Sequence, residues 1–126
     1  MGAQFSKRFA KEGLHSLVSR IEAEGGTTTA VCTDATNEDE VKSLFNEVGE
    51  DLSLAIFNPA FGYSGRIIDM DSEYFERSWK VSCYGGFLFG REALKRMVPR
   101  GEGTILFTGA TAALRGPPKL RNFQFC

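Results

Sequence analysis

LSLAIF, residues 52–57, is an almost continuous apolar run set between turn-forming residues. A run of this kind is typical of a strand that is buried on both faces of a parallel sheet. Two other runs are also rich in β-branched or apolar residues: TTTAVC at 27–32 and TILFT at 104–108. We therefore predict three parallel strands, and we expect 27–32 to pair directly with 52–57.

Helical patterns separate these runs. Residues 2–12 have helical character, and 14–26 carries an amphipathic stripe closed by two glycines. Asn37 and Glu40 stand at capping-box spacing ahead of another apolar stripe. One long helix is predicted over 71–97. Alternation of helices and strands predicts βαβ units and an α/β fold with a parallel sheet.

Length and composition favour one globular domain over residues 1–126. The chain is 42% hydrophobic and 25% charged, with a net charge of -1, so it lacks the basic surface that nucleic acid would require. Three cysteines without metal-ligand or disulfide spacing fit a reducing compartment. The uncharged run 81–90 is too short to cross a membrane, and the first residues lack a signal-peptide core. We expect a cytoplasmic protein without nucleic-acid or membrane partners.

Three loops follow the predicted strands: TDAT at 33–36, NPAFG at 58–62 and TGATAA at 108–113. In parallel sheets ligands bind beyond the carboxyl ends of the strands, and small or short polar residues let a flat ligand approach the backbone there. These loops are therefore candidate ligand-binding segments. The alternative is that they are ordinary turns in which Asp34 and Asn58 cap the following helices.

Order and spacing of several segments resemble the short-chain dehydrogenase/reductases, in register from Gly2 to Gly116. The segments are GAQFSKRFAKEG (2–13), AVCTDATNEDEVKSLF (30–45), LAIFNPA (54–60), GGFLFGREALKRM (85–97) and GEGTILFTGATAALRG (101–116). The resemblance implies a partial Rossmann-like, doubly wound parallel sheet that lacks its first strands. It also implies NAD or NADP as the cofactor.

Four residues fall in cofactor-binding positions of that family. Gly2 matches the last glycine of the phosphate loop, and Asp34 matches the acidic residue that contacts adenine. Asn58 and Ala60 match the segment against the adenosine half of the dinucleotide, although Phe61 takes the place of its glycine. With only one glycine of the phosphate loop matched, the resemblance implies weak or absent dinucleotide binding.

Catalytic positions match less well. Ser82 stands in the place of an asparagine of the family's proton relay, and the serine position falls on Ala110 or Thr111, so Thr111 is the candidate hydroxyl. The tyrosine position falls on Phe123, which has no proton to donate. The Tyr-x-x-x-Lys pair of the family is thus absent, and we expect a truncated, inactive member.

Three hypotheses follow. The first is a fragment or shortened form of an NAD(P)-dependent oxidoreductase that moves hydride between nicotinamide and an alcohol or carbonyl compound. The second is a non-catalytic interaction module that pairs with a full-length relative, as a homo- or hetero-oligomer, through the small-residue face of helix 71–97. That face comprises Ser82, Gly86, Gly90 and Ala93. The alternative is that the same face packs against the protein's own sheet. The third is a chain of marginal stability with unpaired strand edges.

Overall fold

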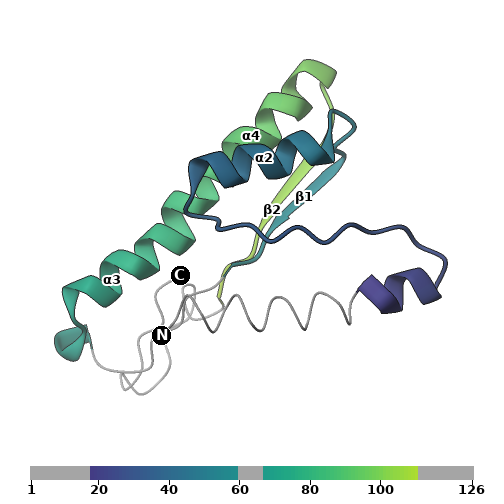
Figure 1. The fold of residues 1–126 in the computed structure, drawn as a ribbon. Coiled ribbons are helices and arrows are strands. Elements are labelled where there is room, and N and C mark those ends of the chain that lie inside the picture. Colours follow the sequence, from purple (N-terminus) through teal and green to yellow (C-terminus); the bar gives the residue numbers. More distant parts are fainter. Residues whose placement is uncertain (1–17, 60–66, 111–126) are drawn as a thin grey trace. The chain divides into compact units, whose positions relative to one another are not determined.

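The computed structural model describes residues 18–59 and 67–110 (Figure 1). Contacts divide the chain into two compact units, Met1–Thr33 and Asp34–Cys126, which are described one at a time. A single domain over residues 1–126 stays a prediction. Among the described residues, no helix combines the length and the hydropathy that crossing a membrane requires.

The described part of the first unit begins with a helical segment at residues 18–23, which confirms that part of the helix predicted over 14–26. Two glycines end it. Gly25 has a positive φ of 82°, its N–H donates to the Glu22 carbonyl at 3.0 Å, and the Gly26 N–H donates to the Ile21 carbonyl at 2.9 Å. This pair of bonds is a Schellman motif, which satisfies carbonyls left open at the helix end.

Residues 26–34 follow without regular secondary structure, so the strand predicted over 27–32 is wrong. The predicted pairing with 52–57 would join the two units, so it stays a prediction. In the described sheet β1 pairs with β2. A strand exists only through ladder bonds to a neighbour. The β-branched residues of TTTAVC favour extended backbone, but propensity alone does not supply that neighbour.

The sheet of the second unit has two parallel strands, β1 (Leu54–Phe57) and β2 (Thr104–Phe107). Leu54 pairs with Thr104 and Phe57 pairs with Phe107. Both strands lie within the runs that predicted them, so the parallel α/β arrangement is confirmed.

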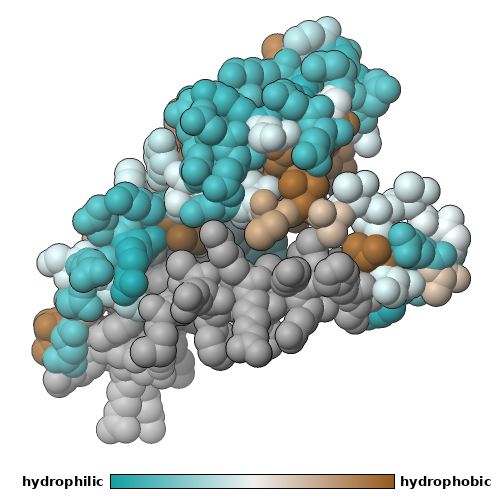
Figure 2. Space-filling view, in the orientation of Figure 1, coloured by the Kyte–Doolittle hydropathy of each residue, from teal (hydrophilic) through white to brown (hydrophobic). Residues whose placement is uncertain are grey.

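Helix α2 (Glu38–Val48) starts where the capping pattern predicted. The Asn37 side chain accepts from the amides of Asp39 at 3.0 Å and Glu40 at 3.2 Å. The Glu40 carboxylate in turn accepts from the Asn37 side-chain amide at 3.2 Å and from the Asp34 amide at 2.7 Å. The start of α2 therefore also holds Asp34, in the loop before the helix, in place. In Figure 2 the visible face of α2 is mostly hydrophilic.

The long helix predicted over 71–97 is present as three consecutive segments after a short 3-10 turn at Ile67–Asp69. They are α3 (Ser72–Trp79), a π turn (Lys80–Tyr84) and α4 (Gly85–Arg100). The π turn was not predicted. Its defining bond runs from the Gly85 N–H to the Lys80 carbonyl, and the extra residue in this turn shifts the faces of α4 relative to those of α3.

Helix α4 lies alongside α2 (Figure 1) and contacts both strands. The core that these elements form is small, with Leu88 and Ala93 fully buried. Its other members are Val41, Phe45, Ala55 and Met97. Of the apolar stripe predicted on α2, Val41 and Phe45 enter this core, whereas Val48 is exposed.

The small-residue face of α4 packs on the protein's own sheet. A Cβ placed on Gly86 would lie 3.4 Å from the Phe57 ring, and one on Gly90 would lie 3.1 Å from the Phe107 ring. Gly86 and Gly90 therefore follow the alternative, packing on the protein's own sheet. Association through the long helix stays a prediction. Glycines at these positions let two phenylalanine rings approach the helix backbone.

One face of β1 remains open, which differs from the predicted burial on both faces. Ala55 and Phe57 are buried, but Leu54 and Ile56 on the other face are about half exposed. Leu106 of β2 shares this exposure. The reason is that α4 packs against the face carrying Ala55 and Phe57, while β2 occupies an edge of β1.

Candidate functional site

Two exposed polar residues mark the carboxyl edge of the sheet. Asn58 directly follows β1 and Thr108 directly follows β2, after the paired residues Phe57 and Phe107. The Thr108 N–H donates to the Phe57 carbonyl at 3.0 Å, which continues the ladder past the last paired residues. Both side chains therefore lie at the edge where parallel sheets bind ligands.

Helix α4 begins at this same edge. Gly86 lies close to the rings of both Phe57 and Phe107, the last residues of the two strands. Ser82 lies four residues earlier, within the π turn, and is partly buried. The structure thus places Ser82 near the carboxyl ends of the strands, on the helix side of the edge. π turns are frequent at functional positions in helices.

A tight turn carries Asp34. The Asn37 N–H donates to the Asp34 carbonyl at 3.0 Å, and Asp34 Oδ1 accepts from the Thr36 amide at 2.9 Å and the Thr36 hydroxyl at 2.8 Å. Within the described ranges, the bonds to this exposed carboxylate end on Oδ1, so Oδ2 can accept a hydrogen bond from a ligand. An aspartate side chain that closes its own turn has a fixed orientation.

This turn lies against the start of α4. An ideal Cβ on Gly85 would be 3.0 Å from the carbonyl oxygen of Ala35, the residue after Asp34. The contact brings the Asp34 turn to the same end of the sheet as the other polar side chains. Three segments far apart in sequence therefore contribute Asp34, Asn58 and Ser82 to one edge.

Ionic contacts hold the first turn of α2 to α4. The Arg91 guanidinium donates to Glu38 at 2.8 Å, and Lys42 reaches the same carboxylate at 2.8 Å. The hydrogen bond from Lys42, followed by that from Arg91, lowers the pKa of Glu38 below its ordinary value. Glu38 thus stays ionised at neutral pH, and its contact with α4 supports the neighbouring Asp34 turn.

The sequence-predicted site residues divide into two groups. The structure brings Asp34, Asn58 and Ser82 to the carboxyl edge, and Gly2, Ala60 and Thr111 lie outside the described residues. The roles of all six residues stay predictions. Sequence reasoning missed Thr36 and Gly85. The Asp-x-Thr spacing of an Asx turn could have indicated Thr36, whereas no local pattern pointed to the contact of Gly85.

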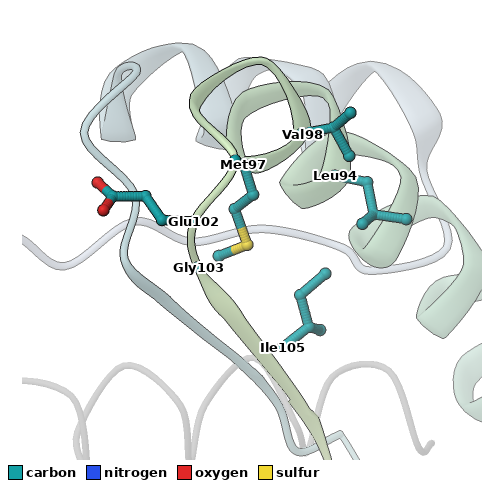
Figure 3. A pocket seen from close by; sticks show the side chains of 7 residues that line it. Leu94, Met97, Val98, Glu102, Gly103 and Ile105 are labelled. Carbon is teal, nitrogen blue, oxygen red and sulfur yellow. The ribbon is translucent and has the colours of Figure 1, made fainter.

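A hollow elsewhere on the protein is not this site. It has a volume of about 530 Å³ and lies between the end of α4 and the start of β2 (Figure 3). Leu94, Met97, Val98 and Ile105 give it an apolar wall, and Glu102 points away from it in Figure 3. The hollow is at the amino end of β2, whereas the polar residues gather at the carboxyl end.

Known proteins share this sequence and fold. Residues 1–124 match the model of a family described as enoyl-(acyl carrier protein) reductase. Short chain aldehyde dehydrogenase 1 of Euphorbia lathyris is 32% identical in an alignment of 104 residues, which covers 79% of this chain and 36% of that protein. The chain spans about half or less of the length of the curated relatives it matches.

Solved structures agree with the sequence relatives. A short-chain dehydrogenase from Rhodopseudomonas palustris has 38% identity and a TM-score of 0.74, covering 92% of this chain and 61% of its own. An NAD+-bound xylitol dehydrogenase has 22% identity and a TM-score of 0.79, covering 87% of this chain and 44% of its own, and so shares the fold. The chain belongs to the short-chain dehydrogenase/reductase family.

Proposed function

We propose that this chain serves a nicotinamide-dependent short-chain oxidoreductase, in which hydride passes between nicotinamide and an alcohol or carbonyl compound. Its own part in that activity is to bind the adenosine end of NAD or NADP. The observation that carries the proposal is the gathering of Asp34, Asn58 and Ser82 at the carboxyl edge of a parallel sheet. We also propose a cytoplasmic location, since Cys32 and Cys83 are free thiols that a reducing compartment maintains.

The described residues fit the adenosine end of a dinucleotide. The Oδ2 atom of Asp34 can accept a hydrogen bond from an adenine amino group or a ribose hydroxyl. Asn58 offers both a donor and an acceptor, and it is exposed at the same edge. When bound, the dinucleotide supplies the hydride chemistry, while these side chains bind and orient its adenosine part.

The Tyr-x-x-x-Lys pattern that the family uses for proton transfer is absent from these 126 residues. None of the three tyrosines, Tyr63, Tyr74 and Tyr84, is followed by a lysine four residues on. The hydroxyls of Ser82 and Thr111 can orient a carbonyl oxygen, but an alcohol holds its proton too tightly to act as a general acid at neutral pH. We therefore propose that a polypeptide of these residues binds the dinucleotide weakly and does not turn it over.

The proposal is tested by NMR titration of the 126-residue protein with NAD and NADP. We expect dissociation constants of about 1 mM or weaker, because the residues include one glycine of the phosphate loop. Asp34→Asn keeps the Oδ1 acceptor of the turn but removes the charge, and it should weaken binding further. Asp39→Asn is the control, since Asp39 is an exposed acidic residue on α2.

Two results would contradict the proposal. If Asp34→Asn and Asp39→Asn change the dinucleotide affinity equally, Asp34 is not part of the site. If no binding is detected at about 20 mM dinucleotide, the proposed site does not bind it. Separately, cofactor-dependent oxidation or reduction of a broad panel of alcohols and carbonyls, read at the nicotinamide absorbance, would show that a different acid acts here.

A second candidate function is association through α4, and an exposed apolar stripe favours it. Phe87, Leu94 and Val98 are 55%, 50% and 68% exposed on one face of the helix. Large side chains of this kind are typical of helix surfaces that a partner covers. We propose that a second copy or a relative covers this stripe.

Sedimentation velocity tests the association. Leu94→Glu should shift an associated species to the monomer, whereas Val48→Glu should not, because Val48 has similar exposure, 47%, but lies on α2. A wild-type protein that remains monomeric at high concentration would exclude a second copy as the partner.

A further inference from the structure

Gly85 occupies the junction between the π turn and α4. Its N–H donates to the Lys80 carbonyl, the bond that defines the π turn. Its φ of -60° and ψ of -41° are ordinary helical values that any residue adopts. Backbone conformation therefore does not require a glycine here, and alanine would be the better helix former.

Space, rather than conformation, requires the glycine. An ideal Cβ at Gly85 would lie 3.0 Å from the Ala35 carbonyl oxygen and 3.4 Å from both the carbonyl carbon and the Cβ of Ala35. The closest atoms belong to backbone, which cannot rotate away as the end of a long side chain can. A methyl group at position 85 must therefore displace the turn or the helix start.

The turn that Ala35 belongs to is held from several sides. Asp34 accepts from the Thr36 amide and hydroxyl, and its own amide donates to Glu40 at 2.7 Å. The helix that follows is tied to α4 by the contact between Glu38 and Arg91 at 2.8 Å. A displacement of Ala35 would therefore be passed to Asp34 instead of being absorbed within the turn.

We propose that Gly85 is a positioning residue for the adenosine end of the dinucleotide site: by lacking a side chain, it lets the start of α4 support the Ala35 backbone and so sets the place of the Asp34 carboxylate. The inference rests on the proposed function, because Asp34 is the group through which Gly85 acts. A carboxylate that binds a ligand must be held within a fraction of an ångström, and the backbone contact supplies that restraint.

The test compares Gly85→Ala with Gly86→Ala by NMR. Both glycines are buried neighbours in α4 and gain the same helix propensity, but the atoms nearest to a Cβ at Gly86 would be ring atoms of Phe57 and Phe107, at 3.4 Å and beyond. In the free protein, we expect the amide signals of Ala35 and Thr36 to move in Gly85→Ala and to keep their positions in Gly86→Ala. Unmoved signals in Gly85→Ala would overturn the inference.

The ligand arm uses 5′-AMP, which carries the adenosine part without nicotinamide. We expect its dissociation constant to rise about fivefold or more in Gly85→Ala and to stay within about twofold in Gly86→Ala. Equal affinity of the two variants would overturn the inference. Absence of 5′-AMP binding by the wild-type protein would refute the proposed function, and the free-protein signals would still decide whether Gly85 holds the turn.

A second variant covers the case in which Gly85→Ala does not fold. Ala35→Gly combined with Gly85→Ala removes one of the crowded atoms and frees the turn to shift. We expect the double variant to fold and to bind 5′-AMP more weakly than the wild type. A double variant with wild-type affinity would show that the place of the Asp34 turn does not depend on Gly85.

Discussion

Phe87 and Leu88 are neighbours on α4 with opposite environments, 55% exposed and fully buried. The same contrast extends along the helix, where Leu94 is exposed and Met97 is buried. Both faces are apolar, so composition does not distinguish them. The elements that pack against a helix, and not its own hydrophobicity, therefore decide which apolar face becomes part of the core.

Those partners can be identified on each side of the buried face. Gly86 and Gly90 admit the rings of Phe57 and Phe107, which brings the sheet against the backbone of α4. On the side of α2, Phe45 meets Phe89 edge to face at a centroid distance of 5.1 Å. On the exposed stripe, the Phe87 ring lies 6.4 Å from the Tyr84 ring and 5.3 Å from the guanidinium carbon of Arg91, residues close to it in sequence.

The largest expected effect comes from truncating the buried face. Leu88→Ala should lower the free energy of unfolding by about 3 kcal/mol, because it removes a fully buried side chain and leaves a cavity in a small core. Leu94→Ala is the control with the same chemical change at a half-exposed position, and it should cost less than about 1 kcal/mol. Urea unfolding measures both, and equal losses would contradict the contrast between the faces.

The strands show how much of the fold was predictable. The apolar runs at 52–57 and 104–108 predicted β1 and β2, because a half-buried strand needs apolar residues wherever it lies. The run at 27–32 has the same local character but is not a strand. Whether these residues form a strand depends on a neighbouring strand to pair with. The position of that neighbour is set by the whole sheet and not by the six residues.

In the helices, too, features that depend on nearby residues were predicted and features that depend on distant residues were not. Asn37 and Glu40 predicted the start of α2, since capping bonds form between residues close in sequence. The π turn at Lys80–Tyr84 was missed, because a bond from Gly85 to Lys80 leaves no pattern of side chains. The choice between a partner and the sheet for Gly86 and Gly90 was open for a similar reason, since the rings that they meet come from distant strands.

For the site, the rule that ligands bind at the carboxyl edge of a parallel sheet predicted the loop that carries Asn58. The same rule was applied to Asp34 through a strand at 27–32 that is not present. Asp34 comes to this edge instead through the contact between Ala35 and the start of α4. The support of the Asp34 turn by Gly85 could not be predicted, because it joins two helix starts that are far apart in the chain.

The second-largest expected loss of stability comes from removing the charge of Glu92, on the buried side of α4. Glu92 is buried among Lys95 at 2.8 Å, Arg91 at 3.3 Å and Arg96 at 3.8 Å. Burial raises the pKa of Glu92, but the hydrogen bond and charge of Lys95, with those of Arg91, outweigh it and lower the pKa below 4.5. Glu92→Gln should therefore cost about 1.5 kcal/mol at pH 7.

The sign of the pH dependence follows from that lowered pKa. A carboxylate with a lower pKa in the folded state stabilises the fold above its ordinary value, and loses that contribution as the pH falls below 4.5 through the folded value. The difference between wild type and Glu92→Gln should shrink as the pH falls from neutral through 4.5 and below. Glu76→Gln, in an exposed pair with Lys80, should change stability little at any of these pH values. If the stability difference between wild type and Glu92→Gln does not change with pH, the pKa of Glu92 is not lowered in the folded protein.

A smaller effect is expected where the glycine face meets the sheet. Gly90→Ala gains helix propensity of up to about 1 kcal/mol, but its Cβ would lie 3.1 Å from the end of the Phe107 ring. That ring is 57% exposed and can move aside. We expect a net gain of about 0.5 kcal/mol in thermal or urea unfolding. A loss would show that the Phe107 ring is held more firmly than its exposure suggests.

The smallest effect belongs to the exposed face. Phe87→Ala removes a stack with Arg91, whose guanidinium carbon lies 5.3 Å from the ring centroid, and an exposed contact of this kind is worth about 0.5 kcal/mol. Alanine is the better helix former by about 0.5 kcal/mol, so the two terms nearly cancel in a monomer. Unfolding of dilute protein should therefore be almost unchanged, in contrast with Leu88→Ala one residue along.

Repeating the measurement at high protein concentration separates packing from association. If a second copy covers this stripe, the wild type gains stability with concentration and Phe87→Ala does not. A large loss in dilute protein would instead mean that the ring is covered within the monomer, and the contrast between the two faces of α4 would not hold.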